Sequence, residues 1–201
     1  VVGELRGRLD MLHALLDQLE CEGQLPDFVL AVGRFLSDAK DAGMVADYVG
    51  AQPRLRLPAP VYFIDAASDV FIQRALNTKR EVTLSQQLVF LGAAGIAELE
   101  GLRIAFLSGS YDEEAYKSVW GCGKFIHERY TKLAVDDIKH KAFLLNKRID
   151  ILMTSEWPDL EWSKTQGRLL APLVSPSRTS LGVRELFFAL RPRYHIFTGG
   201  R

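Results

Sequence analysis

The chain has 201 residues, of which 48% are hydrophobic and 25% are charged, and these proportions exclude a disordered or fibrous protein. Lys plus Arg equals Asp plus Glu at 25 each, so the formal net charge of +0 indicates no polyanionic partner, and any nucleic-acid contact must come from a local patch. Because the sequence has neither an apolar run of about 18 residues nor a signal-peptide pattern, we expect an intracellular, soluble protein with one substantial core.

The first third of the chain predicts a β-α-β arrangement. Val1 and Val2 begin a strand, and an amphipathic helix follows from about Arg8 to Glu22. Residues 27–33 form a continuous apolar run that ends at Gly33, which is typical of a strand buried on both faces. The leucines that define the helix recur at spacings of three and four: Leu5, Leu9, Leu12, Leu16 and Leu19.

The middle of the chain predicts further strands. After a polar helical stretch around residues 40–47 and a proline-rich connection, residues 61–64 form another buried strand. Residues 88–92, 95–99 and 102–108 then predict three successive short strands, with a tight hairpin turn at Glu100 and Gly101. We therefore expect an antiparallel β-meander here.

The last third alternates helices with strands again. A helix is expected at 132–147, a buried strand at 149–154, a helix at 184–190 that Pro192 stops, and a closing strand at 194–197. This order predicts layered α/β architecture with a mixed sheet or two facing sheets, in one domain over residues 1–201. The missing initial Met and the abrupt end suggest a segment of a longer protein.

Ligands of such folds bind just outside the carboxyl ends of the strands, so the segments that follow the strands are the candidate sites. In chain order, these segments resemble the metallophosphoesterase family, whose loops carry D-x-H, G-D, G-N-H-E, a later His and G-H-x-H. Two of them are similar to lariat RNA debranching enzymes: residues 107–109 resemble G-I-S-G, and residues 157–158 resemble the end of S-H-D-W-P.

The amino-terminal domain of CwfJ-type splicing factors is the nearer match. Residues 3–8 resemble its opening G-D-V-E-G-K, and residues 191–196 resemble its closing K-P-R-Y-H-F, so the resemblance covers nearly the whole chain. It implies a metallophosphoesterase-like layered α/β sandwich with mixed β-sheets flanked by helices. It also implies a nuclear protein whose partners belong to the splicing or debranching machinery.

The metal ligands of that family are missing. Glu4 and Arg6 stand at D-x-H, and Arg34 stands where a bridging carboxylate would lie. Ser155 replaces the loop His, and residues 199–201, Gly-Gly-Arg, replace G-H-x-H. The G-N-H-E positions carry Asp65 or Ala66, Ala67, Ser68 and Asp69.

Two bridged metals need carboxylate, imidazole and amide ligands, and a buried Arg34 would repel them. We therefore expect no metal, no cofactor and no catalytic residue, with Arg34 or Arg6 replacing the metal charge and pairing with Glu4, Asp65 or Glu156. The candidate binding residues of this vestigial groove are Glu4, Arg6, Arg34, Asp65, Ser68, Glu156 and His195.

Several of these residues also have a structural interpretation. Arg6, Arg34, Arg191 and Arg193 either form a phosphate-binding rim or make ordinary ion pairs and solvated charges. His195 is either a ligand or a structural histidine within an apolar strand. Trp157 is expected to pack in the scaffold, whereas Trp120 and Trp162 are candidate partner anchors. Cys21 and Cys122 lack metal-ligand spacing and are expected to be free thiols.

Three functions remain open at this point. The first is a noncatalytic docking module in RNA splicing or lariat RNA turnover. The second is an active phosphodiesterase in which Glu4, Asp65, Asp69 and Glu156 hold Mg²⁺ or Mn²⁺. The third is an RNA-binding module, with weak and local contacts because the net charge is zero.

Overall fold

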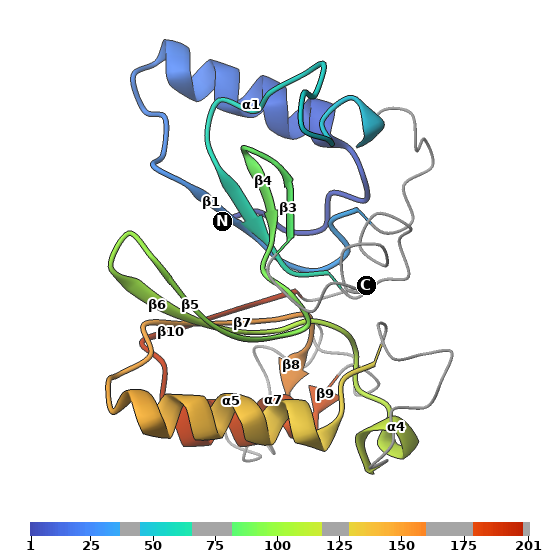
Figure 1. Ribbon diagram of the computed structural model, residues 1–201, viewed down its shortest axis with the longest axis vertical. Coiled ribbons are helices and arrows are strands. Elements are labelled where there is room, and N and C mark those ends of the chain that lie inside the picture. The colour runs from blue at the N-terminus through green and yellow to red at the C-terminus, as the bar shows by residue number, and fades with distance from the viewer. Residues whose placement is uncertain (37–44, 66–81, 118–128, 160–178, 199–201) are drawn as a thin grey trace, which may run out of the picture. The chain divides into compact units, whose positions relative to one another are not determined.

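The computed structural model describes residues 1–36, 45–65, 82–117, 129–159 and 179–198. They form two compact units, Val1–Gly92 and Ala93–Arg201, each with its own four-stranded sheet (Figure 1). Both sheets mix parallel and antiparallel neighbours, and helices flank them, so the predicted α/β class is confirmed. The assignment of both units to one domain stays a prediction.

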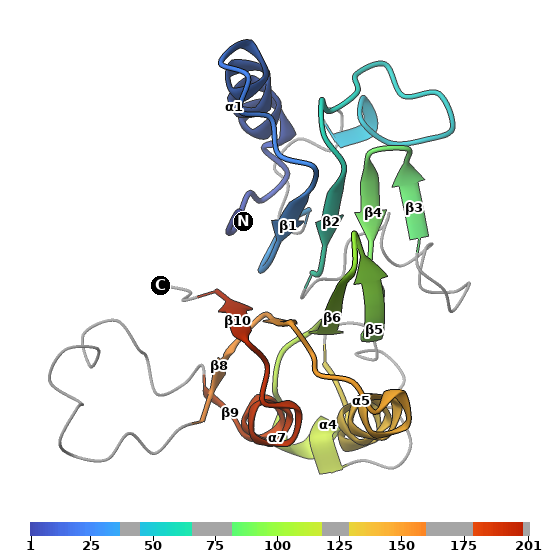
Figure 2. The same cartoon turned by 90° about the vertical axis from the view of Figure 1, so that its left-hand side faces the viewer.

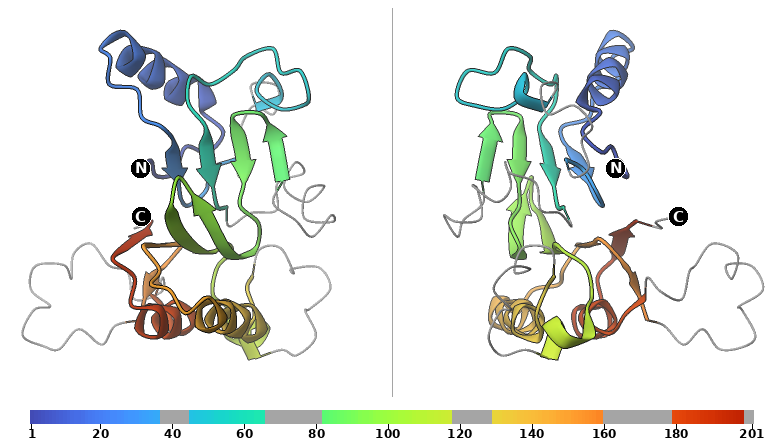
Figure 3. Two further views of the ribbon diagram at one scale, coloured as in Figure 1. Left: turned by 60° about the vertical axis from the view of Figure 1, so that its left-hand side comes forward. Right: turned by 90° about the vertical axis from the view of Figure 1, so that its right-hand side faces the viewer.

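The sheet of the first unit has the order β1-β2-β4-β3, which Figure 3 shows from two sides. Its strands are β1 (Val29–Ala31), β2 (Val61–Phe63), β3 (Val82–Ser85) and β4 (Leu88–Phe90). The strands β1, β2 and β4 run parallel, and β3 is antiparallel to β4. Val2 bridges Ala31 in parallel, so the predicted first strand is reduced to one bridge at the edge of the sheet.

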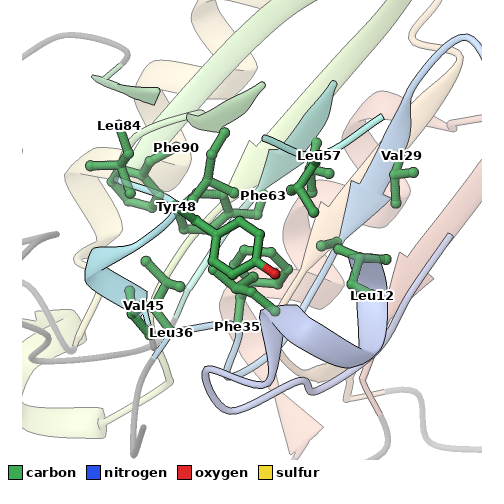
Figure 4. Packing of buried hydrophobic residues seen from close by; sticks show 14 of the residues in the cluster. Leu12, Val29, Phe35, Leu36, Val45, Tyr48, Leu57, Phe63, Leu84 and Phe90 are labelled. Atoms are coloured by element: carbon green, nitrogen blue, oxygen red, sulfur yellow. The ribbon is translucent and has the colours of Figure 1, made fainter. Parts of the chain in front are cut away.

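Helix α1 (Leu9–Cys21) covers one face of this sheet, close to the predicted limits. Its residues Leu9, Leu12 and Leu16 are almost fully buried and belong to the same apolar cluster as Phe63 and Phe90 (Figure 4). Residues 29–32 are all buried, as the continuous apolar run predicted. The leucine repeat thus places the helix, and the apolar run places the strand beneath it.

The sheet of the second unit has the order β10-β7-β6-β5. Its strands are β5 (Ala94–Leu99), β6 (Leu102–Leu107), β7 (Ile151–Thr154) and β10 (Tyr194–Phe197). The strands β6, β7 and β10 are parallel, whereas β5 pairs antiparallel with β6. Glu100 and Gly101 have φ angles of 47° and 78°, which suit a two-residue hairpin turn and confirm the predicted turn.

The expected three-stranded meander is wrong. Strand β4 pairs with β2 and β3 in the first sheet and not with β5. The reason is that β4 is apolar and buried at every position, which suits a central parallel strand better than one arm of a hairpin.

Helices α5 (Lys132–Leu145) and α7 (Leu181–Leu190) cover one face of the second sheet. Thr131 caps α5 by accepting a hydrogen bond from the N–H of Ala134, and Ser180 caps α7 in the same way at Val183. Asn146 takes the left-handed conformation, so α5 ends before the predicted Lys147. The Ser180 cap starts α7 three residues earlier than predicted.

Three short strands and one short helix were not predicted. They are β3, β8 (Trp157–Pro158), β9 (Thr179–Ser180) and α4 (Glu113–Lys117). Such short elements carry no readable periodicity. The polar helical stretch predicted near residues 40–47 lies largely outside the described residues. Among the helices that are described, none is long and apolar enough to cross a membrane.

The cap of α5 gives a first testable prediction. Replacing Thr131 with alanine removes the acceptor for the N–H of Ala134, and we expect the free energy of unfolding to fall by about 1 kcal/mol. Thr131→Ser keeps the acceptor oxygen and should restore most of that loss. Urea unfolding of the three proteins measures the difference, and equal stability of all three would contradict the role of the cap.

Candidate functional site

The carboxyl ends of the parallel strands in the first unit bring four predicted residues to one edge of the sheet. Glu4 and Arg6 follow Val2, Arg34 follows β1, and Asp65 follows β2. The backbone N–H of Arg6 donates to the carbonyl of Arg34 at 2.9 Å, so the first two segments lie side by side. Within this unit, the segments after Val2 and after β1 therefore lie together, as the strand order predicted.

Arg6 forms an ion pair with Glu4, with 2.9 Å between Nη2 and Oε2. This is one of the pairings that the sequence predicted. The Arg6 side chain is 53% exposed, and exposed ion pairs of this kind contribute little to stability. The pair of opposite charges carries no net charge.

Among the described residues of this edge, Asp65 is the buried carboxylate, with 2% exposure. Its Oδ2 accepts a hydrogen bond from the backbone N–H of Leu36 at 2.7 Å. A carboxylate that accepts from a backbone N–H fixes the loop that carries that group. Asp65 therefore ties the end of β2 to the loop after β1.

The expected burial of Arg34 is wrong, because the residue is exposed. Gly33, with a φ of 84°, turns the chain directly after β1, and the carbonyl of Arg34 is used by the neighbouring segment. The turn leaves the nearby apolar residues Val32 and Phe35 in the core, while Arg34 itself lies at the surface. This loop therefore does not place a buried cation at the position where the sequence predicted one.

In the second unit, the carboxyl ends of three parallel strands meet in register. Leu107 of β6 lies beside Thr154 of β7, and Thr154 lies beside Phe197 of β10. The residues that follow are Ser108, Ser155 and Thr198, and the Thr198 hydroxyl donates to the carbonyl of Ser155 at 2.9 Å. The loops after β7 and β10 are therefore joined at this edge.

Glu156, just after β7, is the centre of a hydrogen-bond network. Its Oε2 accepts from the backbone N–H of Tyr111 at 2.7 Å and from the Tyr130 hydroxyl at 2.9 Å. The Tyr130 hydroxyl also bonds to the hydroxyl of Ser180, the residue that caps α7. Burial raises the pKa of Tyr130 well above its ordinary value, and the charge of Glu156 raises it further. Tyr130 therefore stays neutral and acts as a donor.

Sequence reasoning did not find Tyr111, Tyr130 or Arg129 as members of this site. Arg129 donates to the Ser110 hydroxyl at 2.8 Å and to the carbonyl of Tyr111 at 3.2 Å, which holds the loop after β6. Tyr130 lies before a helix and 26 positions from Glu156, and nothing in the spacing relates the two. The sequence signal that could have found Tyr130 is a tyrosine directly before the start of a predicted helix.

His195 lies on β10 beside Leu152, on the sheet face that α5 and α7 cover. Its ring lies 5.8 Å from that of Phe187 on α7. The Thr154 hydroxyl donates to the carbonyl of Glu156 at 2.8 Å, so the His195 Nε2 donates to the Thr154 oxygen at 2.9 Å. This geometry supports the structural interpretation of His195 over the ligand interpretation.

The burial of His195 leads to a prediction about pH. Burial lowers the pKa of His195 to about 4, below the ordinary value of about 6.5. The folded state then binds fewer protons between these values, so stability is full above about pH 6.5 and falls toward pH 4. In His195→Gln, which keeps a donor for Thr154, we expect that loss to shrink by about 2 kcal/mol. Urea unfolding at pH 7 and pH 4.5 measures it, and an unchanged loss would contradict the burial of a neutral ring.

Arg191 and Arg193 do not join a phosphate-binding rim near Glu156. Both precede β10, so they lie at the amino ends of the parallel strands, opposite the end that carries Glu156. There, Arg193 lies 3.8 Å from Asp150, which also accepts from the backbone N–H of Arg103 at 3.0 Å. These contacts match the ion-pair interpretation, and the backbone hydrogen bond from Arg103 and the neighbouring arginines lower the pKa of Asp150.

Taken unit by unit, the described donors at the strand ends do not fit a two-metal centre. In the first unit, Glu4 pairs with Arg6 and Asp65 accepts from a backbone N–H; in the second unit, Glu156 accepts from Tyr111 and Tyr130. Across the described ranges, no three His, Cys, Asp or Glu side chains gather closely enough to hold an ion. The absence of a bound metal in the protein stays a prediction.

Other predicted residues divide into two sets. Trp157 packs on Phe197, with ring centroids 4.5 Å apart, as expected for a scaffold residue. Cys21 is an exposed free thiol. The predicted residues that lie outside the described residues are Ser68, Asp69, Trp120, Cys122, Trp162 and the closing residues 199–201.

Comparison with known proteins identifies relatives along nearly the whole chain, although no family model matches it. The chain is 25% identical over 209 residues to the zinc finger CCCH domain-containing protein 64 of Arabidopsis thaliana, covering 96% of this chain and 32% of that protein. It is 24% identical over 198 residues to CWF19-like protein 1 of Mus musculus, covering 96% and 34%. The Drosophila melanogaster homologue is 23% identical over 203 residues, covering 98% and 34%.

The chain thus spans about a third of the length of the curated relatives that it matches. The similarity to CWF19-like proteins agrees with the CwfJ-type part of the resemblance. Membership of the metallophosphoesterase superfamily and a relation to debranching enzymes stay predictions.

Proposed function

We propose that this chain is a noncatalytic metallophosphoesterase-like domain that acts as a docking module in RNA splicing or lariat RNA turnover. The proposal rests on the similarity to CWF19-like proteins along nearly the whole chain and on the state of the strand-end side chains. The observation that carries it is the network around Glu156. This carboxylate accepts from Tyr111 and Tyr130 and holds loops together.

The first unit supports the same proposal. Asp65 is engaged by the N–H of Leu36, and Glu4 is engaged by Arg6. A two-metal phosphodiesterase needs such carboxylates for its ions, which bring the pKa of a bound water down and clamp the phosphate. Here the carboxylates instead hold loops in place or pair with arginine, which keeps the shape of the surface fixed. A docking module benefits from such a surface, because a preorganised surface loses less entropy when it binds.

The proposal is tested by recovering the tagged chain from nuclear extract that is splicing a labelled transcript. We expect enrichment of excised intron lariat and splicing complexes over a tagged control in which Asp65 is replaced by alanine and the loop is released. Recovery of neither lariat nor splicing complexes with the folded parent chain would overturn the splicing assignment.

The active phosphodiesterase remains the second candidate because Glu4 and Asp65 lie at one edge of the same sheet. Acidic oxygens alone suit Mg²⁺ or Mn²⁺. Turnover of a generic phosphodiester with Mn²⁺ that disappears in Glu4→Ala would favour it. We expect no turnover in either protein.

An RNA-binding module is separated from protein docking by filter binding. Branched and linear RNA are compared at two salt concentrations, because phosphate contacts weaken steeply as salt rises. We expect weak binding that does not distinguish the two RNAs. Tight, branch-specific binding that is lost in Arg6→Ala and Arg34→Ala would favour the RNA module.

A further inference from the structure

The second unit exposes large apolar side chains where α5 and α7 end. Phe143 is 80% exposed, Leu144 is 66% exposed and Leu145 is 44% exposed, all in the last turn of α5. Phe188 of α7 is 57% exposed, and Tyr194 at the start of β10 is 69% exposed. Single exposed apolar residues are common, but exposed apolar side chains that gather on two adjacent helices indicate an interaction site.

Phe143 and Phe188 share one surface because α5 and α7 lie side by side (Figure 2) and their matched contacts show that they run in the same direction. The amino-terminal parts meet where Gly182 lies against Val135, and Lys139 lies 3.1 Å from Glu185 further along. Phe143 follows Lys139 by four positions and Phe188 follows Glu185 by three, so both rings continue the same seam toward the helix ends.

The start of β10 lies beside the end of α5. The N–H of Tyr194 donates to the carbonyl of Asp150 at 3.0 Å, and the N–H of Arg193 donates to the carbonyl of Ile149 at 3.3 Å. Because the His195 side chain lies on the face that α7 covers, strand alternation turns Tyr194 to the opposite face of the sheet, so Tyr194 does not join the rings of the two helices. Leu145, two positions after Phe143, likewise lies on another side of α5. We call the surface at the ends of α5 and α7 the helix-end surface; its apolar members are Phe143, Leu144 and Phe188.

A rim of cations surrounds this apolar centre. Lys147 and Arg148 follow α5, and Arg191 and Arg193 follow α7; all four are exposed. Among the described residues at this end of the sheet, the acidic groups are Asp150, which is buried beside Arg103 and Arg193, and the exposed Glu98 and Glu100 of the β5–β6 hairpin, so the four exposed cations outnumber the two exposed carboxylates. The exposed rim beside the aromatic rings is therefore positively charged.

Cations at the carboxyl end of a helix also stabilise the helix dipole, and this effect accounts for part of the rim. The helix dipole does not account for the apolar side chains, because exposing a Phe or Leu side chain to water is unfavourable. A partner that buries them while it neutralises the rim would account for both features together.

We propose that the helix-end surface docks an acidic, amphipathic peptide segment of a partner protein. Such a segment places Leu or Phe side chains along the seam beside Phe143 and Phe188 and directs Asp or Glu toward Lys147 and Arg148. A peptide is favoured over single-stranded RNA because Leu144, beside Phe143, is aliphatic and cannot stack on bases. The inference goes beyond the proposed function, because this surface lies at the opposite end of the sheet from Glu156.

The test selects a randomised library of 15-residue peptides on the immobilised full chain. We expect the enriched peptides to carry net negative charge and several apolar residues at helical spacing. Binding of enriched peptides should weaken at least about tenfold in Phe143→Ala with Phe188→Ala, and by a similar factor in Lys147→Glu with Arg148→Glu. A uridine 15-mer is measured beside them.

Matched controls remove the same chemistry elsewhere on the chain. Met11→Ala with Leu15→Ala deletes side chains of α1 that are 54% and 47% exposed, and Arg56→Glu reverses an exposed charge. Both should leave peptide binding unchanged. Enrichment of basic peptides, equal loss in the controls, tighter binding of the uridine 15-mer, or self-association that disappears in the Phe143 variant would each overturn the proposal. Failure of this test leaves the strand-end sites and the splicing assignment untouched.

Discussion

Replacing Glu156 with alanine is expected to lower the free energy of unfolding by about 3 kcal/mol, because two partly or fully buried donors lose this acceptor. The backbone N–H of Tyr111 and the hydroxyl of Tyr130 both point to Glu156 Oε2. Tyr130 is 5% exposed, so water cannot easily replace the lost oxygen. Urea unfolding of the parent and the variant gives the difference directly.

Two variants control this prediction. Glu156→Gln keeps an acceptor oxygen at the same position and should cost about half as much. Glu113→Ala removes a carboxylate that is 69% exposed and pairs only on the helix surface, so it should change stability by less than about 0.5 kcal/mol. Parental stability of Glu156→Ala would contradict the network and reopen Glu156 as a ligand.

Replacing Gly182 with valine is expected to destabilise the second unit by about 3 kcal/mol through overpacking. A Cβ at this position would lie 2.9 Å from a ring carbon of Tyr130, 3.0 Å from one of Tyr116 and 3.3 Å from Val135. Neither ring can move freely, because Tyr130 is held by Glu156 and Ser180, and Tyr116 donates to Glu185 at 3.0 Å. A valine at position 182 would therefore displace Tyr130 and disturb its hydrogen bonds to Glu156 and Ser180.

Gly3→Val is the matched control, because a Cβ at Gly3 meets no atom within 4 Å. It should leave the thermal midpoint within a few degrees of the parent. In a Tyr116→Ala background, the same Gly182→Val change should cost less, since one of the two rings that the new side chain meets is gone. Equal effects of the two glycine substitutions would show that the tyrosine rings do not confine Gly182.

Much of the fold could be predicted because its signals are local. The leucine spacing of α1, the apolar runs of β1, β2 and β7, and the Glu100-Gly101 turn each lie within a short window of sequence. The partner of β4 could not be predicted in this way. A short apolar strand is compatible with a hairpin or with a parallel neighbour, and only pairing with β2 decides between them.

The candidate site was predictable in part for a similar reason. The rule that ligands gather at carboxyl strand ends selected Glu4, Arg6, Arg34 and Asp65, and these residues lie at one edge of a sheet, whereas their role in binding stays a prediction. It could not give the exposure of Arg34, which depends on the turn at Gly33, or the side-chain direction of His195, which depends on strand register. Tyr130 was missed because its partner Glu156 is distant in sequence.

The central claim is that the strand ends bind partners without metal-dependent hydrolysis, and the content of bound manganese tests it most directly. The purified chain is equilibrated with Mn²⁺, dialysed and analysed for metal per chain, while hydrolysis of a generic phosphodiester is followed on the same sample. We expect manganese far below one ion per chain and no hydrolysis. A tightly bound pair of ions, with turnover that Glu4→Ala abolishes, would contradict the claim.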